Sequence, residues 1–158
     1  MKRQFIDDDT ITDSAIRIPA IGLELGVLIE PSATQGRATL IETHDAPGFG
    51  PPMHRHENET EVFHVLQGRY LFEVDGKRQI VKAGETLTAH VGTTHRFVNI
   101  DDEPSRMLVL ISPGFDATGF FSELRDVMAD GIPDHATLAR FGAQWHIEFL
   151  GPPLTAQP

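Results

Sequence analysis

The chain of 158 residues contains no cysteine, which excludes a disulfide framework and any chemistry that depends on a thiolate. Long apolar runs are also absent: the longest, Met107–Ile111, is far shorter than the ~20 residues that a membrane-spanning helix needs. Basic residues are scarce, with 13 Lys and Arg against 23 Asp and Glu, and the formal net charge of −10 argues against nucleic acid as a partner. We therefore expect a protein that neither crosses a membrane nor binds DNA or RNA.

The first residues carry no apolar segment of the kind that secretory signals contain. Met1-Lys2-Arg3 is followed by the acidic run 7–9, so we expect a cytoplasmic protein without a secretory signal. The length suits one domain, which at this size buries about 68–70% of its unfolded surface. The chain has no internal repeat and no helix-turn-helix segment, and the second absence argues against a transcription factor.

Three histidines and one glutamate form the most informative pattern in the chain. His54 and His56 alternate within the run 53–61, and alternate side chains of an extended strand share one face. Glu61 ends this run, and His95 follows 34 positions later. Imidazole nitrogens with a carboxylate oxygen suit one divalent transition metal, and these ligands do not rank Mn, Fe, Co, Ni and Zn. An octahedral ion with four such ligands keeps two positions for water, oxygen or substrate.

Glycines at fixed offsets surround these residues. Gly48 precedes His54 by five intervening residues, four residues separate His56 from Glu61, and six more precede Gly68. A second block comprises Gly84, His90, Gly92, His95 and Asn99. Together the two blocks resemble the signature motifs of the cupin family, glycine–x5–His–x–His–x3,4–Glu–x6–glycine and glycine–x5–Pro–x–glycine–x2–His–x3–Asn. The one departure is His90, which stands where the second motif has proline.

The resemblance implies a fold, a ligand set and an oligomeric state. Cupins are all-β proteins built as a double-stranded β-helix, or jelly-roll barrel, and they often pair through edge strands, so we expect a homodimer. In the motifs, the metal-ligand positions fall on His54, His56, Glu61 and His95. The carboxy-terminal run 146–154 is similar to that of small single-domain bacterial cupins described as quercetin-dioxygenase-like.

The residue pattern of the first 113 positions predicts the same architecture. Short runs with period-two alternation predict strands, and Gly, Pro and Asp separate them. Asp75-Gly76 is the dipeptide that two-residue hairpin turns prefer, and Gly92 opens a tight turn that delivers His95 onto the next strand. Residues 1–113 are therefore predicted to form the barrel with its amino-terminal strands. The expected strands are residues 23–29, 37–44, 61–66, 69–74, 79–82, 86–90, 95–100 and 106–112.

Residues 114–158 are predicted to form a helical extension packed on the barrel. Apolar residues at helical spacing follow Thr118, a candidate N-cap. A second helix is expected from Asp134 to about Phe141, with Gly142 as its carboxy-terminal stop. A terminal amphipathic helix usually buries its apolar stripe, so we expect these helices to cover the barrel's outside or a dimer interface rather than form a lid.

Three polar residues near the expected ligands need separate interpretations. His90 is a candidate partner of a metal ligand, an acid/base group at the cavity mouth, or a tolerated substitution in a turn. Glu59 follows His56 by only two intervening residues, which does not fit the motif, so we expect it to face solvent. His64 alternates onto the face opposite Glu61 and is expected to miss the metal.

Apolar residues around the expected ligands predict a cavity suited to a planar small-molecule substrate. The same residues would equally fill a small barrel. The candidates for this lining are Met53, Phe63, Phe72, Leu87 and Phe97.

Three classes of function fit this site. The resemblance to quercetinase-like proteins implies a metal-dependent dioxygenase that acts on an aromatic or enol-containing compound, with Glu61 as general base for a metal-bound hydroxyl. An isomerase or lyase would use the metal to polarise a carbonyl and would need no oxygen. A non-catalytic cupin would bind a small molecule or metal, since one fold hosts many functions.

Overall fold

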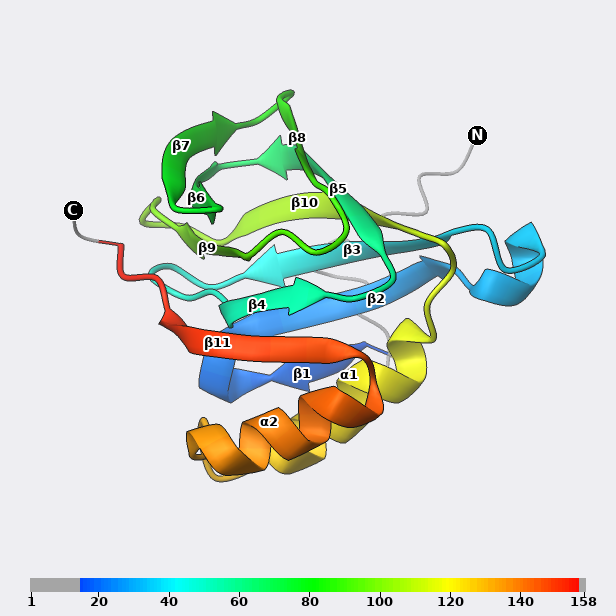
Figure 1. Cartoon of the computed structure of the whole chain (residues 1–158). Helices are drawn as coiled ribbons and strands as arrows, with labels where there is room; N and C mark the ends of the chain where they lie inside the picture. Colours follow the sequence, from blue (N-terminus) through cyan, green and yellow to red (C-terminus); the bar gives the residue numbers. More distant parts are fainter. Residues whose placement is uncertain (1–14, 157–158) are drawn as a thin grey trace.

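The computed structural model describes residues 15–156, and in this part of the chain two antiparallel sheets face one another with two helices along one side (Figure 1). The charged positions 1–9, on which the expectation about a secretory signal rests, lie outside the described residues. Within residues 15–156, no helix is both long enough and apolar enough to cross a membrane.

Each sheet combines strands that are distant in the sequence. The order of the six-stranded sheet is β1-β2-β3-β10-β5-β8, and that of the five-stranded sheet is β11-β4-β9-β6-β7. This interleaving is that of a jelly roll, which confirms the predicted all-β fold with its short helices. The strands are β1 (Ile16–Ile18), β2 (Leu23–Ile29), β3 (Thr39–Asp45), β4 (Pro52–His56), β5 (Thr60–Gln67), β6 (Arg69–Val74), β7 (Lys77–Lys82), β8 (Thr86–Ala89), β9 (His95–Asn99), β10 (Ser105–Ser112) and β11 (Ile147–Pro153). The helices are α1 (Ala117–Val127) and α2 (His135–Gln144), with 3-10 turns at Pro19–Ile21 and Pro31–Thr34.

The two predicted turns form as expected. Asp75 and Gly76 have φ angles of 48° and 79°, the left-handed values that a two-residue turn between twisted strands requires, and they join β6 to β7. Gly92 has a φ of 80°. Beside it, the Thr93 N–H donates to the carbonyl oxygen of His90 at 3.0 Å, which reverses the chain so that His95 begins β9.

Strand parity decides which side chains enter the space between the sheets. Glu61, Phe63 and Val65 of β5 are buried, whereas the residues between them are more exposed. His64 therefore points away from Glu61, and its Nδ1 lies 2.8 Å from the hydroxyl of Thr86 on β8. The prediction that His64 faces away from the candidate ligands is confirmed.

Helix α1 begins one residue after Asp116, not after Thr118. The backbone N–H of Gly119 donates to Asp116 Oδ1 at 3.0 Å, so Asp116 is the N-cap. The hydroxyl of Thr118 instead donates to Glu30 at 2.8 Å. The prediction of Thr118 as N-cap is wrong because a carboxylate two residues earlier satisfies the free N–H groups of the first turn.

The prediction that Gly142 ends the second helix is also wrong, because α2 continues to Gln144. A Cβ atom at Gly142 would lie 2.3 Å from the carbonyl oxygen of Ile147 and 2.9 Å from the ring of Phe149. The glycine is therefore required by the close approach of β11 to the helix rather than by a helix stop.

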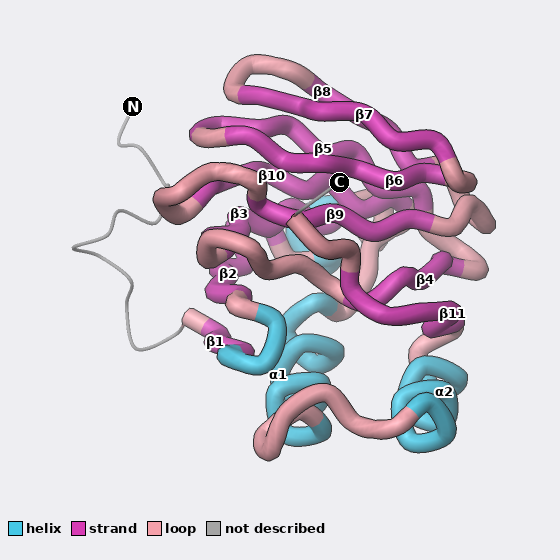
Figure 2. Tube along the Cα trace, turned by 90° about the vertical axis from the view of Figure 1, so that its left-hand side faces the viewer, coloured by secondary structure: helices cyan, strands magenta, loops and turns pink. Residues whose placement is uncertain are grey.

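Strand β11 is an element of the extension that the sequence patterns did not predict. It pairs antiparallel with β4, with Ile147 opposite His56 and Phe149 opposite His54. Figure 2 shows β11 alongside β4, with α2 next to it and α1 next to β1. The extension thus contributes a strand to one sheet beside the strand that carries two of the candidate ligands.

We predict that Gly142→Ala destabilises the protein by about 1–2 kcal/mol, since overpacking against Ile147 and Phe149 outweighs the gain of about 1 kcal/mol that alanine brings to a helix interior. Urea-induced unfolding followed by circular dichroism measures this change. A variant as stable as the parent chain would show that β11 does not hold its place against α2.

Candidate functional site

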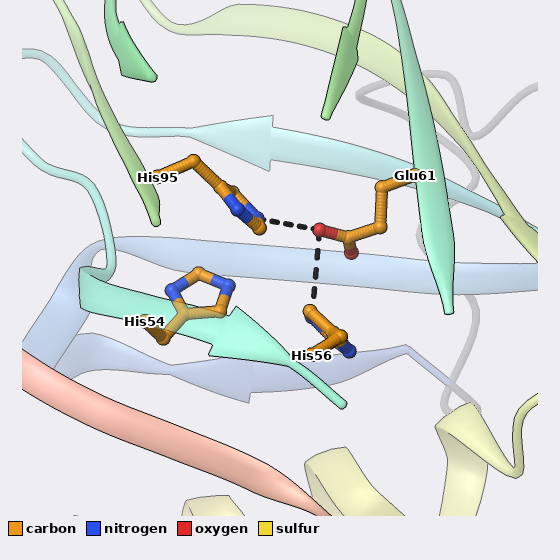
Figure 3. Close-up of side chains that lie close together, drawn as sticks. All are labelled: His54, His56, Glu61 and His95. Atoms are coloured by element: carbon orange, nitrogen blue, oxygen red, sulfur yellow. Dashed lines mark hydrogen bonds and ion pairs between the residues drawn. The ribbon is translucent and has the colours of Figure 1, made fainter. Parts of the chain in front are cut away.

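Three strands bring the four expected ligands together between the sheets. His54 and His56 lie on β4, Glu61 on β5 and His95 on β9. One potential ligand atom from each of these residues lies within 4.8 Å of the others. Figure 3 shows the three imidazoles and the carboxylate converging on one point, with Glu61 linked to both His56 and His95. The structure therefore forms a candidate metal centre from residues that span 42 positions of sequence, from 54 to 95.

The pairing of β4 with β9 and the close contact between their backbones explain how the cluster is assembled. His54 pairs with His95 across β4 and β9, so their rings lie with centroids 4.4 Å apart. Just before β4, a Cβ atom on Gly50 would overlap the carbonyl oxygen of Phe97 at 1.7 Å. Only glycine allows this approach of the chain to β9. The backbone N–H of Gly92 donates to the carbonyl oxygen of His56 at 2.9 Å and ties the end of β4 to the turn before His95.

Each imidazole is held at its Nδ1 atom by an oxygen that can only accept a hydrogen bond. The partners are the carbonyl oxygen of Pro52 for His54 at 2.8 Å, that of Thr93 for His95 at 3.2 Å, and the carboxylate of Glu59 for His56 at 3.3 Å. Nδ1 therefore carries the hydrogen in all three rings. The Nε2 atoms remain to bind a metal, and metal-binding histidines are commonly oriented in this way.

The carboxylate of Glu61 requires a positive charge beside it. Its Oε2 atom lies 2.6 Å from Nε2 of His95 and 3.4 Å from Nε2 of His56, and all three residues are buried. Oε2 and Nε2 of His95, if each presents a lone pair, approach to 2.6 Å only when a proton or a metal ion lies between them. Three nitrogen donors and one carboxylate oxygen fit a divalent transition metal, so the donor set passes the chemical test for such an ion.

The electrostatics of the cluster favour an ionised carboxylate and at least one neutral ring. Burial raises the pKa of Glu61, but the neighbouring His56, His95 and His54 outweigh it and hold that pKa well below its usual value. For His54, burial and then the charges of His95 and His56 lower the pKa to about 3. For His56, burial is outweighed by Glu61 and Glu59, which raise the pKa.

Glu59 does not face solvent as the sequence analysis expected. Its side chain is buried, with a relative exposure of 7%, and its Oε2 atom accepts from Nδ1 of His56. The turn between β4 and β5 folds Glu59 back over the ring, so the interpretation drawn from motif spacing is wrong. Motif spacing identifies Glu61 as the candidate metal ligand, but it cannot reveal that the carboxylate of Glu59 orients the His56 ring through Nδ1.

His90 lies in the turn before β9 with an exposed side chain. Its carbonyl oxygen accepts hydrogen bonds from both the backbone N–H and the hydroxyl of Thr93. The group of candidate metal-binding residues in the described chain consists of His54, His56, Glu61 and His95 and does not include His90. The contacts that His90 makes are thus those of a turn residue.

A cavity that is partly open to solvent extends from the cluster between the two sheets. Of the apolar residues expected to line it, Phe63 and Phe97 do so. Phe72 and Leu87 belong to the packed core instead. Met53 alternates with His54 on β4 and packs against Gly151 of β11. The polar lining consists of Thr43, Asp45, His54, His56 and Glu61.

The carboxy-terminal extension supplies much of the apolar wall. Helix α1 contributes Phe120, Phe121 and Leu124, the loop before it contributes Phe115, and β11 contributes Ile147 and Phe149. Phe149 lies with its ring centroid 6.1 Å from that of His54. Helix α1 is therefore part of the cavity wall, whereas the sequence analysis expected the helices to cover the outside of the barrel or a dimer interface. The amphipathic stripe of α1 was visible in the sequence, but its position against the cavity was not.

Comparison with known proteins agrees with this architecture. Residues 41–111 match the model of the cupin domain. The chain is 35% identical over 85 residues to the epoxidase atD of Aspergillus terreus, an alignment that covers 53% of this chain and only 26% of that enzyme. It is 28% identical over 90 residues to an oxalate-binding protein of Thermotoga maritima, which covers 56% of this chain and 74% of that protein.

A solved structure gives the same result for the fold. The crystal structure of a predicted oxalate decarboxylase from Thermotoga maritima superposes with a TM-score of 0.56 and 26% identity. The superposition covers 58% of this chain and 80% of that one. Each of these alignments covers only part of this chain, so the relatives' names alone do not identify its activity.

We predict that His54→Ala and His95→Ala each abolish tight metal binding while the fold is retained, because each removes one of four converging ligands. Metal content after dialysis, measured by inductively coupled plasma mass spectrometry, checks this. His64→Ala is the matched control, since His64 points away from the cluster. Full metal retention in both ligand variants would contradict the assignment.

We predict that Glu59→Gln weakens metal affinity about tenfold, because a neutral amide holds and polarises the His56 ring less strongly than a carboxylate. Competition with a chromogenic chelator measures the affinity. Glu57→Gln is the control, since Glu57 is exposed and contacts His146 rather than a ligand. Equal affinities of the two variants would remove Glu59 from the metal centre.

Proposed function

Since residues 41–111 of this chain form a cupin domain, we propose that the protein is a metal-dependent oxidoreductase, specifically a dioxygenase that acts on an aromatic or enol-containing small molecule. The observation that carries the proposal is the position of the His54, His56, Glu61 and His95 cluster at the wall of an apolar, phenylalanine-rich cavity. Relatives named epoxidase and probable oxidoreductase are consistent with an oxidative reaction.

The walls of the cavity support an aromatic substrate. Six phenylalanine side chains line it, and face or edge contacts with such rings favour planar apolar molecules. The six are Phe63, Phe97, Phe115, Phe120, Phe121 and Phe149. Apolar walls also lower the local polarity, which strengthens polar interactions at the metal centre.

The residues of the centre have distinct tasks in this proposal. A divalent metal bound by the four ligands would supply a Lewis acid that lowers the pKa of a substrate hydroxyl. The contacts at Nδ1 hold the three imidazoles in position before substrate arrives. Oε2 of Glu61 faces His56 and His95, whereas Oε1 makes no hydrogen bond with the described residues. We assign to this second oxygen the acceptance of the substrate proton.

The relative named oxalate-binding protein suggests a second candidate, the binding of a small dicarboxylate. A bound metal would supply one cationic partner for a dianion, but none of the described residues that line the cavity is Lys or Arg to supply another. The apolar lining therefore favours the aromatic substrate over oxalate.

The test is oxygen consumption by protein reconstituted separately with Mn, Fe, Co, Ni and Zn and offered a flavonol, catechols and enols. We expect uptake with at least one metal and one substrate, its loss in His95→Ala, and its retention in the control His64→Ala. Absence of uptake with every metal, together with conversion of a substrate under anaerobic conditions, would establish an isomerase or lyase instead.

We predict that Glu61→Gln retains part of the bound metal but lowers turnover at least about 100-fold, since an amide oxygen still binds metal but cannot accept the proton. Steady-state oxygen uptake at matched metal content measures the effect. Unchanged turnover would reduce Glu61 to a ligand without a part in proton transfer.

A further inference from the structure

Asp45, the last residue of β3, is an acidic side chain of the cavity outside the metal centre. It is almost fully buried, with a relative exposure of 1%. Its Oδ2 atom accepts hydrogen bonds from the hydroxyl groups of Tyr70 at 2.6 Å and Thr43 at 2.9 Å. Two hydroxyls from different sheets thus fix the orientation of this carboxyl group.

The second oxygen of Asp45 has a different environment. No hydrogen bond from a described residue reaches Oδ1, although the side chain lines the cavity. While Oδ2 accepts both hydroxyl hydrogens, a proton on the carboxyl group is placed on Oδ1. Oδ1 is therefore able to accept a hydrogen bond when the group is ionised and to donate one when it is protonated.

Burial raises the pKa of Asp45 to about 6, against the lowering effects of Tyr70, Thr43 and His44. Both protonation states are thus accessible near neutral pH. A ligand hydroxyl, which can donate as well as accept, is able to pair with either state.

Asp45 and the metal centre lie at different ends of the barrel. Strand β10 pairs with both β3 and β5, and Asp45 is opposite its first residue, Ser105. Glu61 is opposite Ile111, near the other end of the same strand. Between the two polar ends the wall is apolar, with Ile41, Phe97 and Val109 among the lining residues.

We propose that Asp45 is a second polar anchor of the cavity, which binds a hydroxyl group on an elongated, mainly aromatic ligand whose opposite end lies at the metal centre. The inference deepens the proposed function by naming a substrate class, hydroxylated aromatic compounds with polar groups at both ends. It rests on that proposal only in taking the metal centre as the other binding point.

The experiment uses zinc-loaded protein under anaerobic conditions, so that binding is measured without turnover. The probes are 3-hydroxyflavone and its derivatives with one additional hydroxyl at the 7, 3′ or 4′ position. Trp145, the one tryptophan of the chain, reports occupancy because its ring lies 5.8 Å from that of Phe115 and 5.5 Å from that of Phe120. Quenching of its fluorescence gives the dissociation constant of each probe.

We expect one derivative to bind about tenfold more tightly than 3-hydroxyflavone, the gain of one well-placed hydrogen bond to a buried acid. In Asp45→Asn this preference should fall to about twofold, because the neutral amide N–H that replaces Oδ1 makes a weaker hydrogen bond with the ligand hydroxyl than the ionised carboxylate does. Thr43→Val, which removes one orienting hydroxyl, should lower it about threefold. Asp126→Asn, the same chemical change at an exposed position of α1, should keep it.

Equal affinities of all derivatives in the parent chain, or an undiminished preference in Asp45→Asn and Thr43→Val, would overturn the inference. Within each variant, the affinity of each derivative is divided by that of 3-hydroxyflavone. A general loss of stability lowers both affinities and leaves this ratio unchanged. A chain that consumes no oxygen but keeps the Asp45-dependent preference would refute the proposed oxidation alone. Oxygen uptake without any such preference would refute the second anchor alone.

Discussion

The structure depends on bringing one carboxylate and three imidazoles together in a buried space, with potential ligand atoms within 4.8 Å of each other. Burial of Glu61 and His95, with relative exposures of 7% and 2%, is costly unless a positive charge is shared among them. A proton between Glu61 and His95 supplies this positive charge for two of the four groups, whereas a divalent cation bound by all four supplies it for the whole cluster. The short strands β4, β5 and β9 and the turns between them hold these four groups in place.

The geometry of this centre is set by contacts at the Nδ1 atoms of the three histidines, whose Nε2 atoms remain to bind a metal. Two backbone carbonyl groups and the carboxylate of Glu59 fix the orientation of the three imidazole rings. The rings therefore need little reorientation when a metal ion binds. Two of these three contacts are made within two residues of the histidine by the local path of the chain. The third depends on a turn that buries an acidic residue, which explains why the role of Glu59 was hidden in the sequence.

The division between barrel and extension is also a division of tasks. The barrel supplies all four candidate ligands and Asp45, whereas α1, the loop before it and β11 supply much of the apolar wall. Chemistry at the metal centre and selection of a ligand by shape therefore reside in different parts of the chain. The match to the cupin domain model covers residues 41–111, which hold the four candidate ligands and none of the extension, so it says more about the centre than about the molecule that enters the cavity.

Local patterns in the sequence determined eight of the strands (β2, β3 and β5–β10), the Asp75-Gly76 hairpin and the four candidate ligands, because period-two alternation, turn chemistry and motif spacing act over a few residues. The position of β11 beside β4 and the contribution of α1 to the cavity were decided only by the tertiary structure. So was the pairing of Asp45 with Tyr70, 25 positions away. These features arise from packing between segments distant in sequence. A local pattern shows that a segment has an apolar face, but it does not show which other segment packs against that face. Gly142 and Glu59 were misread for the same reason: the partner that decides the role of each lies outside the pattern that was read, on another element or across a turn. Thr118 was misread for a local reason, because Asp116, two residues earlier, caps the helix.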